Sequence, residues 1–380
     1  MGTSVTSIGD SAFAGSPIQS VTWNAKNCQS AYAAFGNQVE TFVFGDSVQT
    51  IPSNVCQGMT KLTSVTIPNT VTSIGNDAFN GCTGLTSITI SSAVTSIGMG
   101  AFVDCIGLDS IAIPNSVNSI GDNAFQNCTG LKFVSIPNAV ISIGNYAFQG
   151  CSGLKSVKIS DSVTSIGVGT FRLCSGLTSI VIPNAVTSIG DRAFYQCSQL
   201  TSVTIPRSVT SIGESVFLDC TGLTSVTCRP YVPATLINGN AFNNCHSSLL
   251  IYVPSQTLTY YQSQWSVYKD IIRPIELNTA AAIDSIRSAT DTITNAHIRA
   301  MADAAVAAVK AATTDEEISS IMSVFFSNLA SAQGLYAEAK TELLGEMATP
   351  CTDCTAVEVT DGTTTVKLYN PTKVSFIKQE

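Results

Sequence analysis

The chain has 380 residues, of which only 12% are charged, and its formal net charge is −8 at pH 7. The charges are spread thinly and form no basic stripe, so we expect neither a nucleic-acid partner nor a polyanion-binding role. No run of 18 apolar residues occurs in the sequence, so we also expect no insertion into a membrane.

An isoleucine returns with a 23-residue period through the middle of the chain. It occupies seven positions: Ile74, Ile97, Ile120, Ile143, Ile166, Ile189 and Ile212. Each of these anchors is followed by phenylalanine at +5, cysteine at +8 and leucine at +11, as in the segment Val117 to Ile136. A fixed period of this length is typical of a solenoid in which each repeat forms one coil.

Less regular copies of the repeat extend the array on both sides. Ile8 opens the chain, Cys28 takes the isoleucine position of a degenerate repeat, and Ile51 starts the next one. At the far end Ile237 follows after a 25-residue step and keeps the spacing to its phenylalanine and cysteine. Eleven anchors therefore cover most of residues 1–253, which we predict to be the solenoid.

Each repeat predicts one strand with one buried face. In the segment Leu85 to Ile90, apolar residues alternate with hydroxyl residues, so the isoleucines point inward and Ser87 and Thr89 point outward. A second short extended stretch ends at the anchor isoleucine, and the glycine after it permits the next bend. The Asp or Asn that often follows predicts a cap for a short helical turn carrying the Ala-Phe pair. Stacking then builds a continuous core that one coil alone cannot form.

Seven of the 13 cysteines lie one per coil, at the inward +8 position. They are Cys82, Cys105, Cys128, Cys151, Cys174, Cys197 and Cys220. Neighbouring coils would bring stacked thiols within bridging range, but inward parallel side chains of this kind more often remain small buried hydrophobes. We therefore interpret the seven as a structural ladder of free thiols.

The segment Ile113 to Leu131 reads I-P-N-S-V-N-S-I-G-D-N-A-F-Q-N-C-T-G-L. It resembles the repeat of bacterial leucine-rich-repeat proteins of the BspA type at nearly every position. The resemblance implies a mainly β, right-handed leucine-rich-repeat solenoid and a role in adhesion or interaction at a surface. It extends to residues 254–277, which would form a cap that shields the last open strand edge. The cap residues are Tyr260, Tyr261, Trp265, Tyr268 and Ile272.

Beyond the cap the composition changes. Residues 278–348 carry apolar stripes at helical spacing, and Thr314 to Glu317 predicts a capping box at the start of a second helix. The simplest interpretation is an antiparallel helical hairpin, and the same seam would also allow self-association. In residues 349–380, two alternating runs around Asp361-Gly362 predict a β-hairpin with a third strand at Val374 to Phe376. This small element must dock on the helices or on a partner.

The sequence offers little reactive chemistry. Cys351 and Cys354 form a single CxxC motif, which cannot complete a zinc site without ligands from elsewhere. A strand pattern rather than a helix follows it, so we interpret the pair as a local disulfide or as idle thiols. His246 and His297 are interpreted as structural or solvated, and the repeated glycines as turn residues. We expect no catalytic residue, no metal and no cofactor.

A ligand surface is expected where exposed template positions depart from Ser and Thr. Phe133 and Lys158 stand at outward strand sites, and Ile141 stands where threonine is usual, with Tyr146 close behind. We hypothesise that these four residues mark a contact patch, because exposed aromatic and apolar groups gather at interfaces. The alternative is tolerated drift in a decaying repeat.

Two classes of function follow from these observations. The first is an extracellular or cell-surface adhesin that binds a host or microbial surface protein or glycan through its array face. The second is a structural component of a virion or appendage, such as a phage tail-associated host-attachment protein, which the self-pairing helices and the β tail favour. The chain starts inside a repeat without a visible secretory signal, so we expect a removed upstream segment or a first coil covered by another chain. We favour the first class because the repeat resemblance is the stronger evidence.

Overall fold

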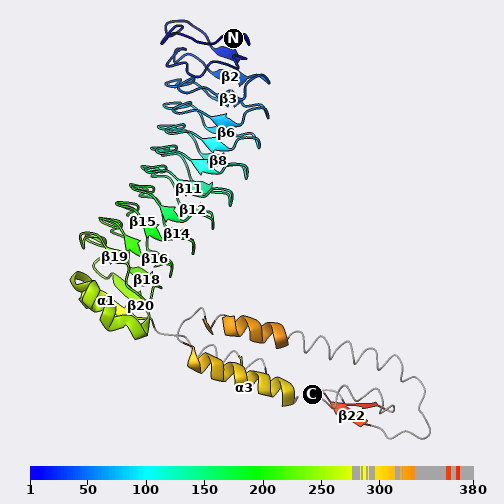
Figure 1. The fold of residues 1–380 in the computed structure, drawn as a ribbon, viewed down its shortest axis with the longest axis vertical. Helices are drawn as coiled ribbons and strands as arrows, with labels where there is room; N and C mark the ends of the chain where they lie inside the picture. Colours follow the sequence, from blue (N-terminus) through cyan, green and yellow to red (C-terminus); the bar gives the residue numbers. More distant parts are fainter. Residues whose placement is uncertain are drawn as a thin grey trace. The chain divides into compact units, whose positions relative to one another are not determined.

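The computed structural model describes residues 1–275, 283, 286–287, 290, 296–312, 317–318, 320–329, 357–360 and 365–368. The chain divides into two compact units, Met1–Ile275 and Glu276–Glu380. The first unit is a β-solenoid of about eleven coils stacked along one axis, running from the blue N-terminus to the yellow-green cap (Figure 1). This is the solenoid that the 23-residue period predicts, and it agrees with the leucine-rich-repeat fold that the resemblance implies.

Each coil contributes one long strand to one side of the solenoid, which we call the long-strand face. These strands are β1 (Ser20–Trp23), β2 (Thr41–Phe44), β4 (Ser64–Thr66), β6 (Ser87–Thr89), β8 (Ser110–Ala112), β10 (Phe133–Ser135), β12 (Ser156–Lys158), β14 (Ser179–Val181), β16 (Ser202–Ile205), β18 (Ser225–Cys228) and β20 (Leu250–Val253). They pair in parallel in three hydrogen-bonded groups, β1-β2-β4, β6-β8-β10-β12 and β14-β16-β18-β20, and β21 (Ile272–Pro274) extends the third group.

Most coils also contribute a two-residue strand to a second side, which we call the short-strand face. These strands are β3 (Thr50–Ile51), β5 (Ser73–Ile74), β7 (Ser96–Ile97), β9 (Ser119–Ile120), β11 (Ser142–Ile143), β13 (Ser165–Ile166), β15 (Ser188–Ile189), β17 (Ser211–Ile212) and β19 (Thr235–Leu236). The anchor isoleucines pair with one another from coil to coil, as Ile74 does with Ile97 and Ile97 with Ile120. This register keeps every anchor on the buried side.

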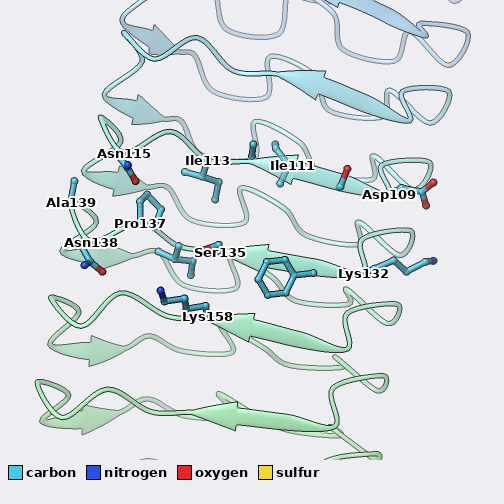
Figure 2. Close-up of a pocket in the computed structure, with 14 residues that line it drawn as sticks. Asp109, Ile111, Ile113, Asn115, Lys132, Ser135, Pro137, Asn138, Ala139 and Lys158 are labelled. Carbon is cyan, nitrogen blue, oxygen red and sulfur yellow. The ribbon is translucent and has the colours of Figure 1, made fainter.

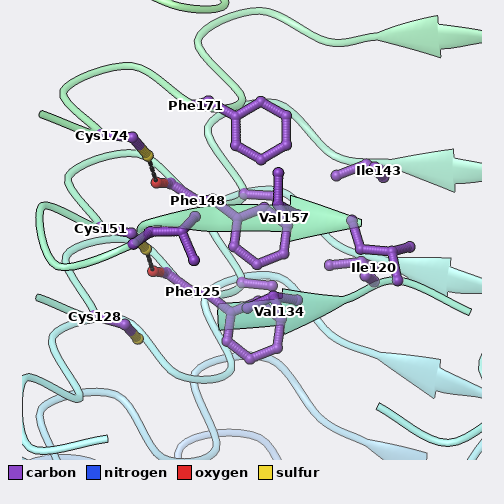
Figure 3. Packing of buried hydrophobic residues seen from close by; sticks show 14 of the residues in the cluster. Ile120, Phe125, Cys128, Val134, Ile143, Phe148, Cys151, Val157, Phe171 and Cys174 are labelled. Atoms are coloured by element: carbon purple, nitrogen blue, oxygen red, sulfur yellow. Dashed lines mark hydrogen bonds between the residues drawn. The ribbon is translucent and has the colours of Figure 1, made fainter. Parts of the chain in front are cut away.

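The core contains a continuous column of phenylalanine rings. Successive rings from Phe79 to Phe242 lie 5.2–5.6 Å apart between centroids, with interplanar angles of 12° or less. Figure 3 shows Phe125, Phe148 and Phe171 stacked in this way beside the strand valines. Because each ring contacts the ring of the coil before and the coil after, the column joins neighbouring coils directly.

The segment that carries the Ala-Phe pair is a run of turns and not the right-handed helical turn that the sequence predicts. The residue just before the pair takes a left-handed backbone conformation, with φ of 52° at Asp77 and 57° at Asn123. A residue in this region cannot continue a right-handed helix. The predicted cap is also wrong, because Asp122 Oδ1 accepts the backbone N–H of Asn145 in the next coil at 2.7 Å. These side chains therefore join coils.

The last anchor is Leu236, and the prediction of Ile237 is wrong by one residue. Leu236 pairs with Ile212 and is partly buried, whereas Ile237 is 46% exposed. Asn238 and Gly239 both take positive φ angles and form the bend that absorbs the extra residue. Phe242 consequently still reaches the phenylalanine column.

Residues 254–275 cover the end of the solenoid. They form η1 (Ser255–Thr257), α1 (Leu258–Gln264), η2 (Ser266–Ile271) and β21 (Ile272–Pro274), and β21 pairs in parallel with β20. Trp265 Nε1 donates to the Ala234 carbonyl at 2.8 Å, and its ring lies 5.9 Å from that of Phe242. Tyr261 Oη donates to the Pro230 carbonyl at 2.8 Å. The aromatic groups thus close the core while their polar atoms remain hydrogen-bonded.

The second unit contains helical and β segments. Helix α3 (Ala296–Ala311) and the described residues of 317–329 share one buried cluster, which includes Ile298, Val309 and Phe325. Strands β22 (Val357–Thr360) and β23 (Thr365–Leu368) pair antiparallel, as predicted for a hairpin. The predicted third strand, most of the capping box and the CxxC motif lie outside the described residues. No helix in the described part of the chain is both long and apolar enough to cross a membrane.

Candidate functional site on the long-strand face

A groove of about 690 Å³ lies on the long-strand face, across the coils that contain β8, β10 and β12 (Figure 2). Its floor consists of outward strand residues and of the turns that follow the strands. The polar residues that line it are Asp109, Ser110, Asn115, Lys132, Ser135, Asn138 and Lys158. The groove exists because the strands of adjacent coils are in register, which places the same template positions side by side.

Phe133 is the aromatic residue of the groove. On β10 it pairs with Ser110 of β8 on one side and with Ser156 of β12 on the other. Both neighbours are small, so they cannot cover the ring, and 50% of Phe133 is exposed. The site therefore presents a half-exposed ring between the side chains of Ser110 and Ser156.

Three lysines lie in or beside the groove, and two of them, Lys132 and Lys158, line it. Lys132 precedes β10, Lys155 stands at the same template position one coil later, and Lys158 ends β12 beside Ser135. All three are exposed. No carboxylate in the described part of the chain lies within ion-pair distance of their ammonium groups. The groove consequently offers unpaired positive charge next to an aromatic surface.

The hypothesised patch of four residues is divided by the structure. Phe133 and Lys158 both line the groove, whereas Ile141 and Tyr146 do not. Ile141 is 63% exposed but directly precedes β11 of the short-strand face. Tyr146 lies in the turn after β11, is half-buried, and packs its ring against Gly169 of the next coil.

Sequence reasoning missed three residues of this face. Lys132 and Lys155 are one repeat period apart, so they are neighbours in adjacent coils. This 23-residue spacing is the sequence signal that could have identified them. Val181 occupies the template position of Lys158 one coil later and is 78% exposed. Its apolar side chain at an outward site was the signal there.

The seven ladder cysteines lie in the core, on the far side of the strands from this groove. All are fully buried and free. Each Sγ donates a hydrogen bond of 3.1–3.2 Å to a backbone carbonyl of the preceding coil, as Cys151 does to Phe125 and Cys174 to Phe148 (Figure 3). Burial raises the pKa of these thiols, to about 12 for Cys105, so they remain neutral and unreactive.

The two histidines and the possible metal ligands were the other candidates for reactive chemistry. His246 is exposed, and its Nδ1 lies 2.8 Å from Ser248 Oγ. Within the described ranges, no three His, Cys, Asp or Glu side chains are grouped so that they could hold a metal ion. His297 belongs to α3, but its side chain lies outside the described part.

Comparison with known families assigns the repeat. The model of the BspA type leucine rich repeat region matches residues 1–65, 49–178 and 141–270, in six copies. The chain belongs to the BspA-type leucine-rich-repeat family. Membership of this repeat family supports an interaction role for the BspA-type solenoid. No curated protein matches the sequence.

Solved structures of several bacterial proteins are similar to this BspA-type chain. A leucine-rich-repeat protein from Treponema pallidum is 30% identical, with 42% of this chain and 78% of that chain covered and a TM-score of 0.41. A leucine-rich cell surface protein from Faecalibacterium prausnitzii is 29% identical, with coverage of 59% and 69% and a TM-score of 0.40. A leucine-rich-repeat protein from Bacteroides ovatus is 25% identical, with coverage of 72% and 88% and a TM-score of 0.35.

Proposed function

We propose that this protein is a non-enzymatic recognition module that binds a protein or glycan of a host or microbial surface in the groove around Phe133 and Lys158. The observation that carries the proposal is the exposed ring of Phe133 between two serines. Because Phe133 is half-exposed and stacks on no other ring in the described part of the chain, its apolar surface is available to a ligand. Exposed aromatic groups of this kind dominate the energy of many interfaces.

We place the protein outside the cell, displayed at a surface. Only 12% of the chain is charged, and one outward row of the long-strand face consists largely of serines: Ser87, Ser110, Ser156, Ser179 and Ser202. Membership of the BspA-type family supports the same placement. In this arrangement the long-strand face would be presented to neighbouring molecules.

The test is the binding of the full chain to a panel of immobilised surface proteins and glycans and to intact cells. Phe133→Ala should weaken binding by about 2 kcal/mol, or roughly 30-fold, because it removes the aromatic anchor. Ile141→Ala is the matched control, since this exposed apolar residue lies on the short-strand face and should leave binding unchanged. Neither substitution should change the free energy of unfolding by more than about 0.5 kcal/mol.

Two results would count against the proposal. Equal binding by Phe133→Ala and the parent chain would remove the groove from the recognition site. An equal loss with Ile141→Ala would mean that the ligand contacts the short-strand face as well, as in the four-residue patch, and that the groove is not the site by itself.

The second candidate function is a structural role in a virion or appendage, with self-association through residues 278–348 and docking through residues 349–380. Val324 and Phe326 favour it, because both are exposed on a helical segment whose Phe325 is buried. Light scattering of the full chain and of a chain lacking residues 278–380 tests it. A trimer that is independent of concentration and is lost on truncation supports this role, and a monomer in both cases contradicts it.

A further inference from the structure

We propose that the ligand of the groove is a segment of an acidic polysaccharide, with one sugar ring on Phe133 and its carboxylate groups beside the three lysines. The inference rests on the proposed function, because it names the ligand class of the same groove. It is carried by the positions of the lysines along the strands, by the exposed ring of Phe133, and by the polar groups that line the groove.

The register of the coils gathers the positive charge. The Lys155 backbone N–H donates to the Lys132 carbonyl at 2.9 Å. These two lysines therefore directly precede neighbouring strands, whose backbones lie about 4.8 Å apart. Lys158 is three residues further along β12, about 10 Å from Lys155. Cations therefore stand at both ends of the strand segment that carries Phe133, a spacing that suits successive anionic groups along one chain.

The cluster is unusual for this chain. Residues 1–253 contain five lysines, namely Lys26, Lys61, Lys132, Lys155 and Lys158, and three of them are in this cluster. Asp109 is the one carboxylate among the lining residues, so the groove is positive while the whole chain carries −8. A positive site on an acidic surface selects anionic ligands and directs them to that place. The expectation of no polyanion partner rests on the low charged fraction, the negative net charge and the absence of a basic stripe in the sequence, none of which reveals lysines that the stacking of coils brings together.

The uncharged groups favour a sugar over an acidic peptide. A pyranose has an apolar face that can lie on an aromatic ring, and hydroxyl groups at its rim that bond to Ser and Asn side chains. The groove supplies Phe133 for the first, and Ser110, Ser135, Asn115 and Asn138 for the second. A folded protein partner typically buries roughly 800 Å² per side around several apolar anchors. This groove offers one exposed ring, since its other apolar lining residues are buried isoleucines, two alanines and a proline.

Isothermal titration calorimetry of the full chain with defined oligomers tests the inference. The probes are hexagalacturonic acid, its fully methyl-esterified form, hexaglutamate, and sialyllactose as an acidic chain end. We expect hexagalacturonic acid to bind at least about tenfold more tightly than the other three. Its affinity should fall with added salt, because exposed charges are screened.

Variants locate the site. Phe133→Ala and the double variant Lys155→Gln/Lys158→Gln should each weaken hexagalacturonic acid binding by about tenfold or more, while Lys61→Gln should change it by less than about twofold. Lys61 is the matched control because it is an exposed lysine of another coil whose Nζ donates to Gln38. An equal loss with Lys61→Gln would show that overall charge, and not this groove, governs binding.

Each other outcome contradicts the inference in a distinct way. Equal binding of the methyl ester means that carboxylates are not recognised. Equal binding of hexaglutamate points to an acidic peptide, and preference for sialyllactose points to a glycoprotein chain end. If no probe binds, but a ligand from the wider panel is lost with Phe133→Ala, the acidic polysaccharide fails and the proposed function stands.

Discussion

Replacing Phe148 with alanine should produce a large loss of stability that stays local. Phe148 is fully buried and stacks on Phe125 at 5.2 Å and on Phe171 at 5.6 Å. Truncating a buried phenylalanine costs about 3–5 kcal/mol through the lost burial and the cavity left behind. Two ring contacts are lost together, each worth about 0.5–1.5 kcal/mol beyond burial, so we expect the upper end of this range, about 4–5 kcal/mol.

The assay combines urea denaturation with hydrogen exchange followed by mass spectrometry. Each coil contacts only its neighbours, so exchange should accelerate in β10, β12 and β14, while β2 and β18 keep the protection of the parent chain. Phe148→Leu is the control, because it retains most of the volume and should cost less. A loss below about 1 kcal/mol would refute the reasoning about the column. A uniform rise in exchange over the whole solenoid would refute the nearest-neighbour description.

Two further predictions concern the core and the turns. Gly144→Ala should cost more than about 2 kcal/mol in urea denaturation, because its Cβ would lie 2.3 Å from the backbone nitrogen of Asp122 in the preceding coil. Gly15→Ala, which would meet no atom within 4 Å, should stay within about 0.5 kcal/mol, and equal losses would contradict the predicted clash. Burial raises the pKa of Cys105 from 9.0 to about 12 and so favours the neutral thiol in the folded state. The resulting stability is fully present below pH 9 and is lost as the pH rises from 9 to 12, so the urea midpoint should fall over that interval. Fast alkylation of the native ladder thiols at pH 9 would contradict their burial.

The solenoid was predictable because its period and its hydrophobic positions are both explicit in the sequence. Isoleucine, phenylalanine and leucine recur at fixed steps, so each of these positions must point to the buried side of every coil. The alternation of Leu85 to Ile90 correctly assigned the inward and outward residues, and Trp265 of the predicted cap lies against Phe242 at the end of the column.

The turns were harder to predict, because apolar spacing carries no information about the sign of φ. In the sequence Asp122 resembles a helix cap, but its Oδ1 accepts a hydrogen bond from the backbone of the next coil. Local sequence patterns carry no information about such contacts between repeats. Ile237 was chosen because its spacing to the next phenylalanine matched the template. The structure instead inserts one residue in the bend and uses Leu236.

The candidate site was predictable only in part. Phe133 and Lys158 stood out because they depart from the Ser and Thr series at outward positions. Ile141 and Tyr146 also depart from the template, but they belong to other sides of the coil. Lys132 lies between a core leucine and Phe133. Its proximity to Lys155 becomes evident only when the sequences of neighbouring coils are aligned in register.

The most direct test of the account is binding by two variants that each lack one complete coil. Deleting residues 117–139 removes one full repeat that includes Phe133, and deleting residues 186–208 removes one full repeat outside the groove. Both joins preserve the repeat template, so both variants should keep β-rich circular dichroism and cooperative unfolding. We predict that the panel ligand bound best by the parent chain will be lost with the first deletion and retained with the second. If neither variant folds, the claim that the coils are interchangeable units of one repeat is contradicted. Equal binding by both variants would contradict recognition in the groove.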